Sequence, residues 1–397
     1  MSIATLASDT AHVAAASKPR ASWWRGPRFL VEVFDGADEA LAALEAVQGG
    51  LASTGFQSLN WLTVLYEELA PAQRAMPRLV VVTERNSGDV AMILPLVVKK
   101  KRSLRVARFA DMGVSDYGAP ILGPALLTKR RSMRRAWRAV RHAMRDVDLI
   151  RLEKMPAEIG GRANPLLSRA GIAPSRFPGQ LLHVPVSVNE FIESRGDAFV
   201  EAYVGSLKLL AKEGAVRFSR ATEPEEIARA YSVLEEQQAA RKSVQRSQLI
   251  FNDPVYRQFY ERVVMDGSEV DLGHLFKLEA GGEVIATLFG ILHDGTFTVL
   301  RVGDAGDTWN DIAPARLILI DVLRYFVDRD VRVFDLGLGS DAGKASFGAS
   351  DVQLYDLIVA RDLAAVPRAT FHRVKGRARK NQRLRAFARR LARLRSG

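Results

Sequence analysis

A carboxylate, a glycine-bearing loop and a lysine follow one another within ten residues near the end of the chain. Gly337 and Gly339 come just after Asp335, and Lys344 follows them. A strand expected over residues 331–336 would bring Asp335 to the rim of a substrate site. The alternative is an ordinary acidic loop with a solvated lysine.

The connection before this segment offers a place for an activated acyl carrier. An expected strand ends at Val302 and Gly303, and a helix is expected to start at Ala313. The free N–H groups and the dipole at the start of a helix favour a pyrophosphate or a thioester oxygen. Asp304 lies in this connection.

The common catalytic templates are absent from the sequence. It has no Gly-x-Ser-x-Gly elbow, no Walker loop, no His-Glu-x-x-His pair and no dinucleotide fingerprint. Its six histidines are scattered without ligand spacing, and it contains no cysteine. The lack of cysteine excludes disulfides, thiolate metal sites and a cysteine nucleophile, and it suits a reducing cytoplasm. We therefore expect no metal.

The positive charge is concentrated at the C-terminal end. The chain has 397 residues with 57 Lys and Arg against 45 Asp and Glu, a net charge of +12. Residues 366–397 hold twelve of the basic residues and no acidic one, so residues 1–365 are formally neutral. This distribution argues against a protein whose whole surface binds nucleic acid. No stretch approaches the ~18 apolar residues of a membrane-spanning helix.

Hydrophobic periodicity and turn signals predict the same order of helices and strands twice. The first series has helices over 37–47, from 58 and over 129–145, with strands over 78–84, 90–98, 104–110 and 147–152. The second has helices over 189–213, from 224, from 254 and over 313–329, with strands over 274–279, 284–292, 296–302, 331–336 and 353–359.

The repeated order predicts an α+β (mixed α/β) fold of two tandem domains, each a mostly antiparallel sheet flanked by helices. Phe56 and Trp61 match Phe251 and Tyr256 at equal spacing, which favours an internal duplication. Two unrelated domains with similar apolar patterns are the alternative. The expected division is a disordered segment over 1–27, domains over 28–180 and 181–365, and a basic amphipathic helix over 366–397.

Short motifs in this order resemble the acyltransferase family named for cellulose biosynthesis (CelD/BcsL-like), a branch of the GNAT acetyltransferase superfamily. The matching residues are the helix start at Ala313-Pro314-Ala315-Arg316, the strand end at Phe334-Asp335-Leu336-Gly337 with Gly339, Lys344 with Phe347, and Ser115-Asp116-Tyr117-Gly118. Two positions depart from the family pattern, since Ala315 stands for a glycine and Gly343 for a tyrosine.

The resemblance implies tandem GNAT-like domains, with acetyl-CoA or another acyl-CoA held by the second. The implied donor-binding residues are Val302, Gly303, Ala313, Pro314, Ala315 and Arg316. The implied acceptor-binding residues are Asp116, Tyr117, Arg241, Lys242, Gly337 and Gly339. The implied catalytic candidates are Asp335, as base or substrate orienter, then Asp304 as the second candidate for that role, and Lys344. For Arg241 and Lys242, pairing with the C-terminal dipole of the preceding helix is the alternative.

The resemblance also implies an enzyme, a GNAT-family N-acetyltransferase or acyltransferase of bacterial exopolysaccharide and cell-envelope biosynthesis. Its acceptor would be an amino sugar, another carbohydrate or a lipid-linked sugar, whose amine or hydroxyl attacks the thioester while backbone N–H groups stabilise the oxyanion. One alternative is a Fem-type transferase that uses aminoacyl-tRNA. Another is a catalytically silent, membrane-tethered scaffold for polysaccharide synthesis.

The C-terminal segment combines its charge with apolar residues at helical spacing. They are Phe371, Val374, Leu384, Phe387, Leu391 and Leu394. Such a segment fits an anionic leaflet, which predicts a cytoplasmic protein at the inner face of the plasma membrane. A helix packed on its own domain, or contact with RNA or a cyclic dinucleotide, are the alternatives.

Overall fold

The computed structural model describes residues 24–25, 28–47, 49–101, 103–125, 127–240, 253–339 and 342–361. The predicted basic helix over 366–397 lies outside the described residues, as do Arg241 and Lys242. Within the predicted disordered segment over 1–27, Trp24 and Arg25 form a short strand, because they pair with Val31 and Leu30.

The first half is built on a nine-stranded sheet in the order β1-β2-β3-β4-β5-β7-β18-β10, with β6 paired to β4. Its neighbours are antiparallel except β5 and β7, which are parallel. The strands are β1 (Trp24–Arg25), β2 (Phe29–Asp35), β3 (Met76–Glu84), β4 (Val90–Lys101), β5 (Leu104–Phe109), β6 (Ile121–Leu122), β7 (Leu149–Met155), β10 (Ile172–Pro174) and β18 (Tyr355–Ala360).

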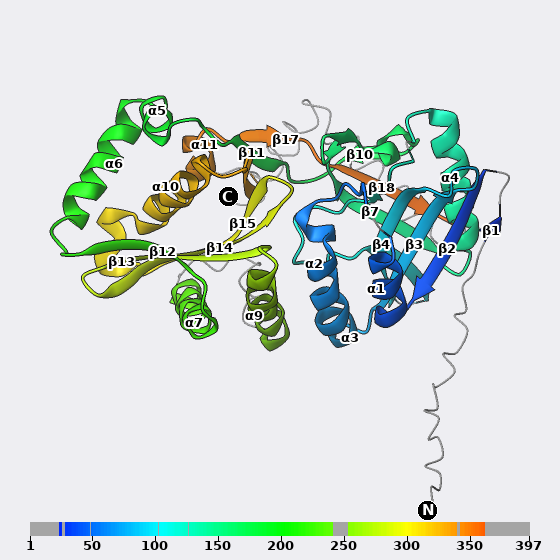
Figure 1. The fold of residues 1–397 in the computed structure, drawn as a ribbon, viewed down its shortest axis with the longest axis horizontal. Helices are drawn as coiled ribbons and strands as arrows, with labels where there is room; N and C mark the ends of the chain where they lie inside the picture. Colours follow the sequence, from blue (N-terminus) through cyan, green and yellow to red (C-terminus); the bar gives the residue numbers. More distant parts are fainter. Residues whose placement is uncertain are drawn as a thin grey trace, which may run out of the picture.

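Helices cover both faces of this sheet (Figure 1). They are α1 (Ala37–Glu45), α2 (Leu59–Val64), continued by a π turn (Leu65–Leu69) and α3 (Ala70–Ala72), and α4 (Arg130–Ala143). The predicted period of α4 is confirmed, since Met133, Trp137 and Val140 are buried against the sheet. Beyond β7, a short hairpin of β8 (Glu158–Ile159) and β9 (Arg162–Ala163) precedes β10.

The second half is built on a seven-stranded sheet in the order β12-β13-β14-β15-β16-β11-β17. Its neighbours are antiparallel except β15 and β16, which are parallel. The strands are β11 (Gly179–His183), β12 (Val216–Ala221), β13 (Gly273–Ala280), β14 (Glu283–His293), β15 (Thr296–Asp304), β16 (Val333–Leu338) and β17 (Ser350–Val352). The helices are α5 (Val188–Glu193), α6 (Asp197–Leu210), α7 (Pro224–Ala240), α9 (Pro254–Glu269), α10 (Pro314–Val327) and α11 (Ala342–Ser346).

The two faces of the second sheet have different partners. On one face α10, α5 and α6 bury Phe297, Phe334 and other strand residues in a core of their own. On the other face α7 and α9 share a core with the helices of the first half. Trp61 of α2 meets Phe259 of α9 edge to face, with ring centroids 5.1 Å apart. The face of β15 and β16 opposite α10 is therefore turned toward the junction of the halves.

The structure confirms the α+β class and the two sheet-bearing halves, and it corrects two predicted elements. The helix predicted over 189–213 is broken between α5 and α6, where Gly196 has φ of 93°, a conformation that favours glycine. The strand predicted over 353–359 forms as β18, but it joins the first sheet, and the short strand β17 before it joins the second.

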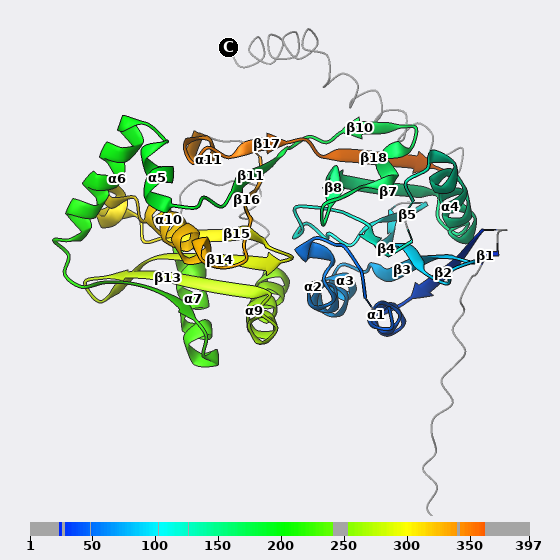
Figure 2. The same cartoon turned by 45° about the horizontal axis from the view of Figure 1, so that its top comes forward.

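One strand therefore crosses the predicted boundary at residue 180. β18 follows the second half in the sequence but completes the first sheet between β7 and β10 (Figure 2). The predicted limits of the two domains stay a prediction, but the first sheet is not made from one continuous stretch of chain, whereas the second is built from residues 179–352.

Candidate active site

Asp335 lies where two parallel strands separate. β15 and β16 pair only from Thr296 with Val333 to Thr298 with Asp335. Beyond this point β15 continues to Asp304, whereas β16 stays paired with β11 on its other edge. The side chain of Asp335 is on the face opposite Phe334, which packs under α10. The carboxylate is thus directed toward the junction of the two halves.

The edge of β15 beyond Thr298 is shaped for a ligand. Arg301 pairs with Phe289 and Val299 pairs with Gly290, so Leu300 is an extra residue, a β-bulge. Bulges redirect backbone groups and are common beside active sites. No strand among the described residues pairs with this edge after Thr298. Backbone groups that point to this edge therefore do not bond a neighbouring strand, an arrangement that suits an oxyanion site.

Asp335 is a buried carboxylate held by few partners. Asp335 is only 1% exposed to solvent. The backbone N–H of Gly337 donates to Oδ1 at 2.8 Å, and the Thr298 hydroxyl donates to Oδ2 at 3.4 Å. Burial raises the pKa of Asp335 to about 7, against the smaller lowering effect of the Gly337 N–H. No cation among the described residues is within ion-pair distance of it.

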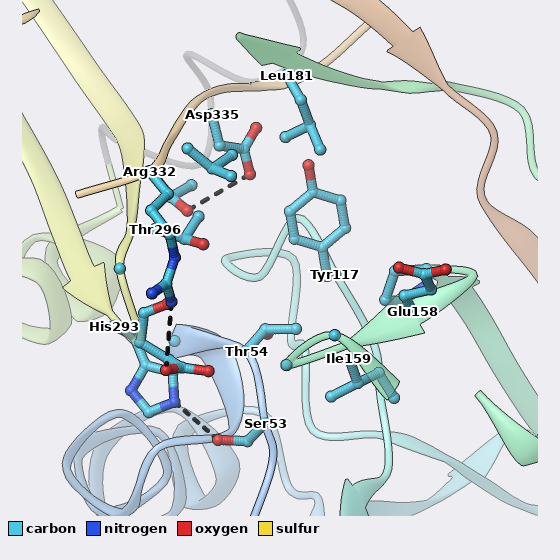
Figure 3. A pocket seen from close by; sticks show the side chains of 18 of the residues that line it. Ser53, Thr54, Tyr117, Glu158, Ile159, Leu181, His293, Thr296, Arg332 and Asp335 are labelled. Carbon is cyan, nitrogen blue, oxygen red and sulfur yellow. Dashed lines mark hydrogen bonds and ion pairs between the residues drawn. The ribbon is translucent and has the colours of Figure 1, made fainter. Parts of the chain in front are cut away.

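The first half supplies two side chains to this site. Asp116 accepts a hydrogen bond at Oδ2 from the backbone N–H of Leu338, at 3.3 Å. The hydroxyl of Tyr117 points toward Asp335 (Figure 3). Its buried oxygen has no hydrogen bond of regular geometry in the described residues, yet it lies near enough to lower the pKa of Asp335. Burial raises the pKa of Tyr117 itself, and the Asp335 carboxylate adds to this.

Glycine at two positions makes this meeting of the halves feasible. A Cβ on Gly337 would lie 2.7 Å from Oδ2 of Asp116, and its φ of 78° also favours glycine. A Cβ on Gly179 would lie 2.6 Å from the hydroxyl oxygen of Tyr117. The close approach of Asp116 and Tyr117 to β16 and β11 therefore depends on the missing side chains.

A cavity of about 530 Å³ opens between the halves beside Asp335. Asp335, Tyr117 and Thr298 line one part of it, and Glu158, His293 and Arg332 line others (Figure 3). His293 shares a hydrogen bond of 2.9 Å with the Ser53 hydroxyl, and burial lowers the pKa of His293, which keeps its ring neutral near pH 7. The cavity thus joins a buried carboxylate to a partly apolar space large enough for a sugar-sized acceptor.

Most of the predicted catalytic and acceptor residues come together here. Nζ of Lys344 donates to the carbonyl oxygen of Leu338 at 2.9 Å, and its charge lowers the pKa of both Asp116 and Asp335. Gly339 has φ of 82° and donates its N–H to the carbonyl of Pro178. Gly337 and Gly339 therefore shape the turn that carries Lys344 back toward the site.

Asp304 and the predicted donor residues lie elsewhere. Asp304 ends β15 six residues after Thr298, about 20 Å along an extended strand. Gly303 is pressed against Gln237 and Thr287, whose oxygens would lie 2.6 and 2.7 Å from a Cβ. Val302 is half-buried on the same strand. This second base candidate is not brought to the carboxylate that faces the cavity.

The start of α10 can offer a ligand backbone N–H groups but little positive charge. Ala313 precedes it with φ of 51°, Pro314 is buried at its first position, and Ala315 follows. Arg316 turns to α6, where it donates to the Ala202 carbonyl at 3.1 Å and the Ser206 hydroxyl at 2.9 Å. Residues 302–315 contain three aspartates and no Lys or Arg. The cavity beside Asp335 has none of residues 302–316 in its lining.

Sequence reasoning missed the cavity wall. Thr298, His293, Glu158 and Ser53 come from separate parts of the chain, and none belongs to a recognisable motif. The alternation of Thr296, Phe297 and Thr298 was the available signal, because it puts two hydroxyls on the face opposite the core. Among the described residues no group of three metal-ligating side chains is placed to hold a metal ion. In that same part of the chain, no helix is both long and apolar enough to cross a membrane.

The comparisons with known proteins agree with this architecture. Residues 203–345 match the family model described as acetyltransferase (GNAT) domain. No curated protein matches the chain. Among solved structures, FemX is similar at a TM-score of 0.53 and 10% identity, over 81% of this chain and 96% of that one. An identity this low supports a shared fold only.

Two further structures are similar at lower scores. The C-terminal domain of a putative lysylphosphatidylglycerol synthetase from Agrobacterium fabrum has a TM-score of 0.47 and 12% identity, over 85% of this chain and 96% of that one. A tandem GNAT protein from the clavulanic acid biosynthesis pathway has 0.42 and 14%, over 83% and 98%.

The chain is an enzyme of the acyltransferase type. Its second half carries an acetyltransferase (GNAT) domain, whose matched region runs from α6 to α11 and includes the separating strands β15 and β16. The first half repeats the same plan of antiparallel strands, a helix and one parallel pair.

Proposed function

We propose that the protein transfers an acyl group, acetyl in the simplest case, from acyl-CoA to the amine or hydroxyl of an amino sugar or another cell-envelope precursor. The resemblance to the cellulose-biosynthesis branch suggests a precursor of exopolysaccharide. The observation that carries the proposal is Asp335, a buried carboxylate at the separation of β15 and β16 and in the wall of the cavity between the halves.

Asp335 suits the role of general base. A pKa of about 7 leaves a large fraction ionised near neutral pH and still makes the carboxylate basic enough to accept a proton. In the proposed step Asp335 takes the proton that the acceptor loses as its nitrogen or oxygen bonds to the acyl carbon. The carbon–sulfur bond breaks, and the sulfur leaves as a thiolate that is protonated by solvent. Asp335 then returns its proton to water.

The edge of β15 suits the thioester end of the donor. When bound, acyl-CoA supplies an acyl group already activated by its sulfur. The bulge at Leu300 and the unpaired edge after Thr298 offer backbone N–H groups to the carbonyl oxygen that becomes negative during the attack. Asp335, one strand away from Thr298, stands within reach of the same point.

The phosphate end of the donor finds less support. The residues before α10 carry Asp304, Asp307 and Asp311 and no basic side chain, and Arg316 is turned to α6. Only the first N–H groups of α10 remain for a pyrophosphate. Donor affinity should therefore come mainly from the backbone of β15 and from the part of the donor near the sulfur.

The lack of basic side chains for a pyrophosphate favours one alternative, a Fem-type transferase that uses aminoacyl-tRNA. Its reactive end has an ester and no pyrophosphate, and FemX overlaps the present chain along 96% of its own length. The same carboxylate could serve the same attack on an ester carbonyl.

Isothermal titration separates the two donors. Acetyl-CoA should bind the wild type and the Asp335→Asn variant with similar affinity, while only the wild type forms acetylated glucosamine from acetyl-CoA. Binding to aminoacyl-tRNA without binding to acetyl-CoA would overturn the acyl-CoA proposal. Equal acetylation by the wild type and the variant would remove Asp335 as the base.

A further inference from the structure

One face of α4 is covered by basic side chains. The exposed residues are Lys129, Arg130, Arg131, Arg134, Arg135, Arg138, Arg141 and Arg145, here called the α4 basic face. The opposite side of the helix, with Met133, Trp137 and Val140, is buried in the core of the first half. No acidic residue interrupts the sequence from 129 to 145.

This charge brings α4 no stability of its own. Its first turn has no acidic residue, and cations there oppose the helix dipole. Arg130 and Arg134, Arg131 and Arg135, and other pairs four residues apart repel each other on the helix surface. None of the eight side chains forms an ion pair with a carboxylate in the described part of the chain. A charge that opposes folding and meets no internal partner indicates an external anion.

Two basic residues from other parts of the chain extend the face. Arg361 donates to the backbone carbonyl of Arg141, and Arg169 follows the short helix that packs on α4. Burial lowers the pKa of Arg169, and Arg134 and Arg141 lower it further; Arg141 has the same effect on the pKa of Arg361. Nε of Arg169 is buried without a hydrogen-bond partner among the described residues. Three separate segments thus gather like charges on one side of the molecule.

The last described residue lies beside this face, and a basic sequence follows it in the chain. Arg361 is the last described residue and lies against α4, and residues 366–397 add twelve Lys and Arg with no acidic residue. That sequence also has apolar residues at helical spacing, including Phe371, Phe387 and Leu391. A nucleic acid needs only the charge, whereas a bilayer uses charge and apolar anchors together. The combination favours a lipid surface.

We propose that the α4 basic face, with Arg169 and Arg361, is a docking surface for a membrane leaflet rich in anionic phospholipid. The face itself contributes charge, because the apolar side of α4 is buried in the protein. The apolar residues that favour lipid over nucleic acid are in the sequence from 366 to 397. Its arginine forks suit lipid phosphate groups. The docking is independent of the acyl-transfer chemistry, since α4 contributes no residue to the cavity beside Asp335.

Vesicle co-sedimentation of the full chain tests this surface. The test variant is Arg134→Gln, Arg138→Gln, Arg141→Gln, and the control removes three exposed charges from the second half, Lys212→Gln, Arg217→Gln, Arg229→Gln. On vesicles of phosphatidylcholine with phosphatidylglycerol, the test variant should bind about tenfold or more weakly than the wild type, and the control within about twofold. Binding of the wild type should fall at high salt and on phosphatidylcholine alone.

Three results would overturn the proposal. The first is vesicle binding of the test variant equal to that of the control. The second is wild-type binding that does not depend on anionic lipid. The third is retention of vesicle binding by the test variant together with a loss of binding to a mixed-sequence duplex RNA, which would make the face a nucleic-acid site. Thermal melting checks folding, and the test variant should melt no lower than the wild type because it relieves repulsion on α4.

Discussion

Each half of the molecule has one parallel strand pair, and the two pairs end differently. In the second half the last pair joins Thr298 to Asp335, and the edge of β15 beyond it is free of a strand partner within the described residues. In the first half the last pair joins Arg108 to Arg151. Beyond it, residues 115–118 fold back onto β7, where Gly118 donates its N–H to the carbonyl of Lys154.

The buried carboxylates beside the two pairs differ in the same way. Asp111 in the first half forms ion pairs with Lys154 at 3.0 Å and with Arg108 at 3.5 Å. Burial tends to raise the pKa of Asp111, but these two cations outweigh it, and the pKa is lowered. Asp335 is still more buried and has no such pair, so its pKa is raised to about 7. The carboxylate of the first half holds a loop, and the carboxylate of the second half has the raised pKa that the proposed base requires.

The loop held by Asp111 in the first half also contributes to the candidate site in the second half. The loop anchored by Asp111 and Lys154 carries Asp116 and Tyr117 across the junction to Asp335. Residues 115–118 thus occupy the space beyond the parallel pair of the first half and also contribute side chains beside Asp335 in the second half.

The largest expected effect comes from removing the reactive carboxylate. Asp335→Asn should lower kcat by about 100-fold or more, because general-base catalysis contributes about that much. The melting temperature at pH 8 should not fall, since the variant removes a buried charge without a counterion. Steady-state kinetics and calorimetry measure both quantities. If Asp335→Asn keeps the wild-type kcat, then Asp335 is not a base and does not differ in role from Asp111.

Removing the paired carboxylate should affect stability first. Asp111→Asn leaves Lys154 without its partner, and breaking a buried ion pair should lower the free energy of unfolding by about 3 kcal/mol. Guanidinium denaturation measures this loss. The matched comparison is Asp335→Asn under the same conditions. An Asp111 variant as stable as that one would contradict the structural role of the pair.

Alanine substitutions at two glycines with similar φ distinguish backbone strain from steric collision. Gly337→Ala and Gly339→Ala both place a Cβ at positive φ, 78° and 82°, which costs about 1–2 kcal/mol of stability. Only the Cβ at 337 meets another atom, Oδ2 of Asp116 at 2.7 Å. Gly337→Ala should therefore also lower kcat/KM severalfold, by displacing Asp116. If the two variants have equal kcat/KM, the position of Asp116 does not matter for catalysis.

A further expected effect is a dependence of stability on pH. Folding raises the pKa of Asp335 from 3.8 to about 7, so the folded state binds more protons than the unfolded state between these values. Stability should fall as pH rises through this window, and the full cost of the buried charge is present above pH ~7. Denaturation curves of the wild type and Asp335→Asn should diverge from pH 4 to 7. The logarithm of kcat/KM should rise with pH and level off near 7, and a flat profile would argue against a base.

Much of the fold and part of the site follow from local sequence. The apolar period of α4 and the strand that carries Asp335 were predictable, because each depends on neighbouring residues alone. The break at Gly196 and the transfer of β18 to the first sheet were not. Strand partners are chosen by packing among distant segments, and a local pattern does not contain that information.

The sequence by itself determined the types of residue available: a carboxylate at a strand end, glycines after it, no cysteine, and basic runs with no acidic residue among them. Only the tertiary structure decided which of them act together. It buried Asp335 without a cation, joined Asp116 and Tyr117 to it across the junction, and set Arg361 against α4. The physical reason is that burial and charge pairing depend on distances in space, whereas sequence constrains only neighbours along the chain.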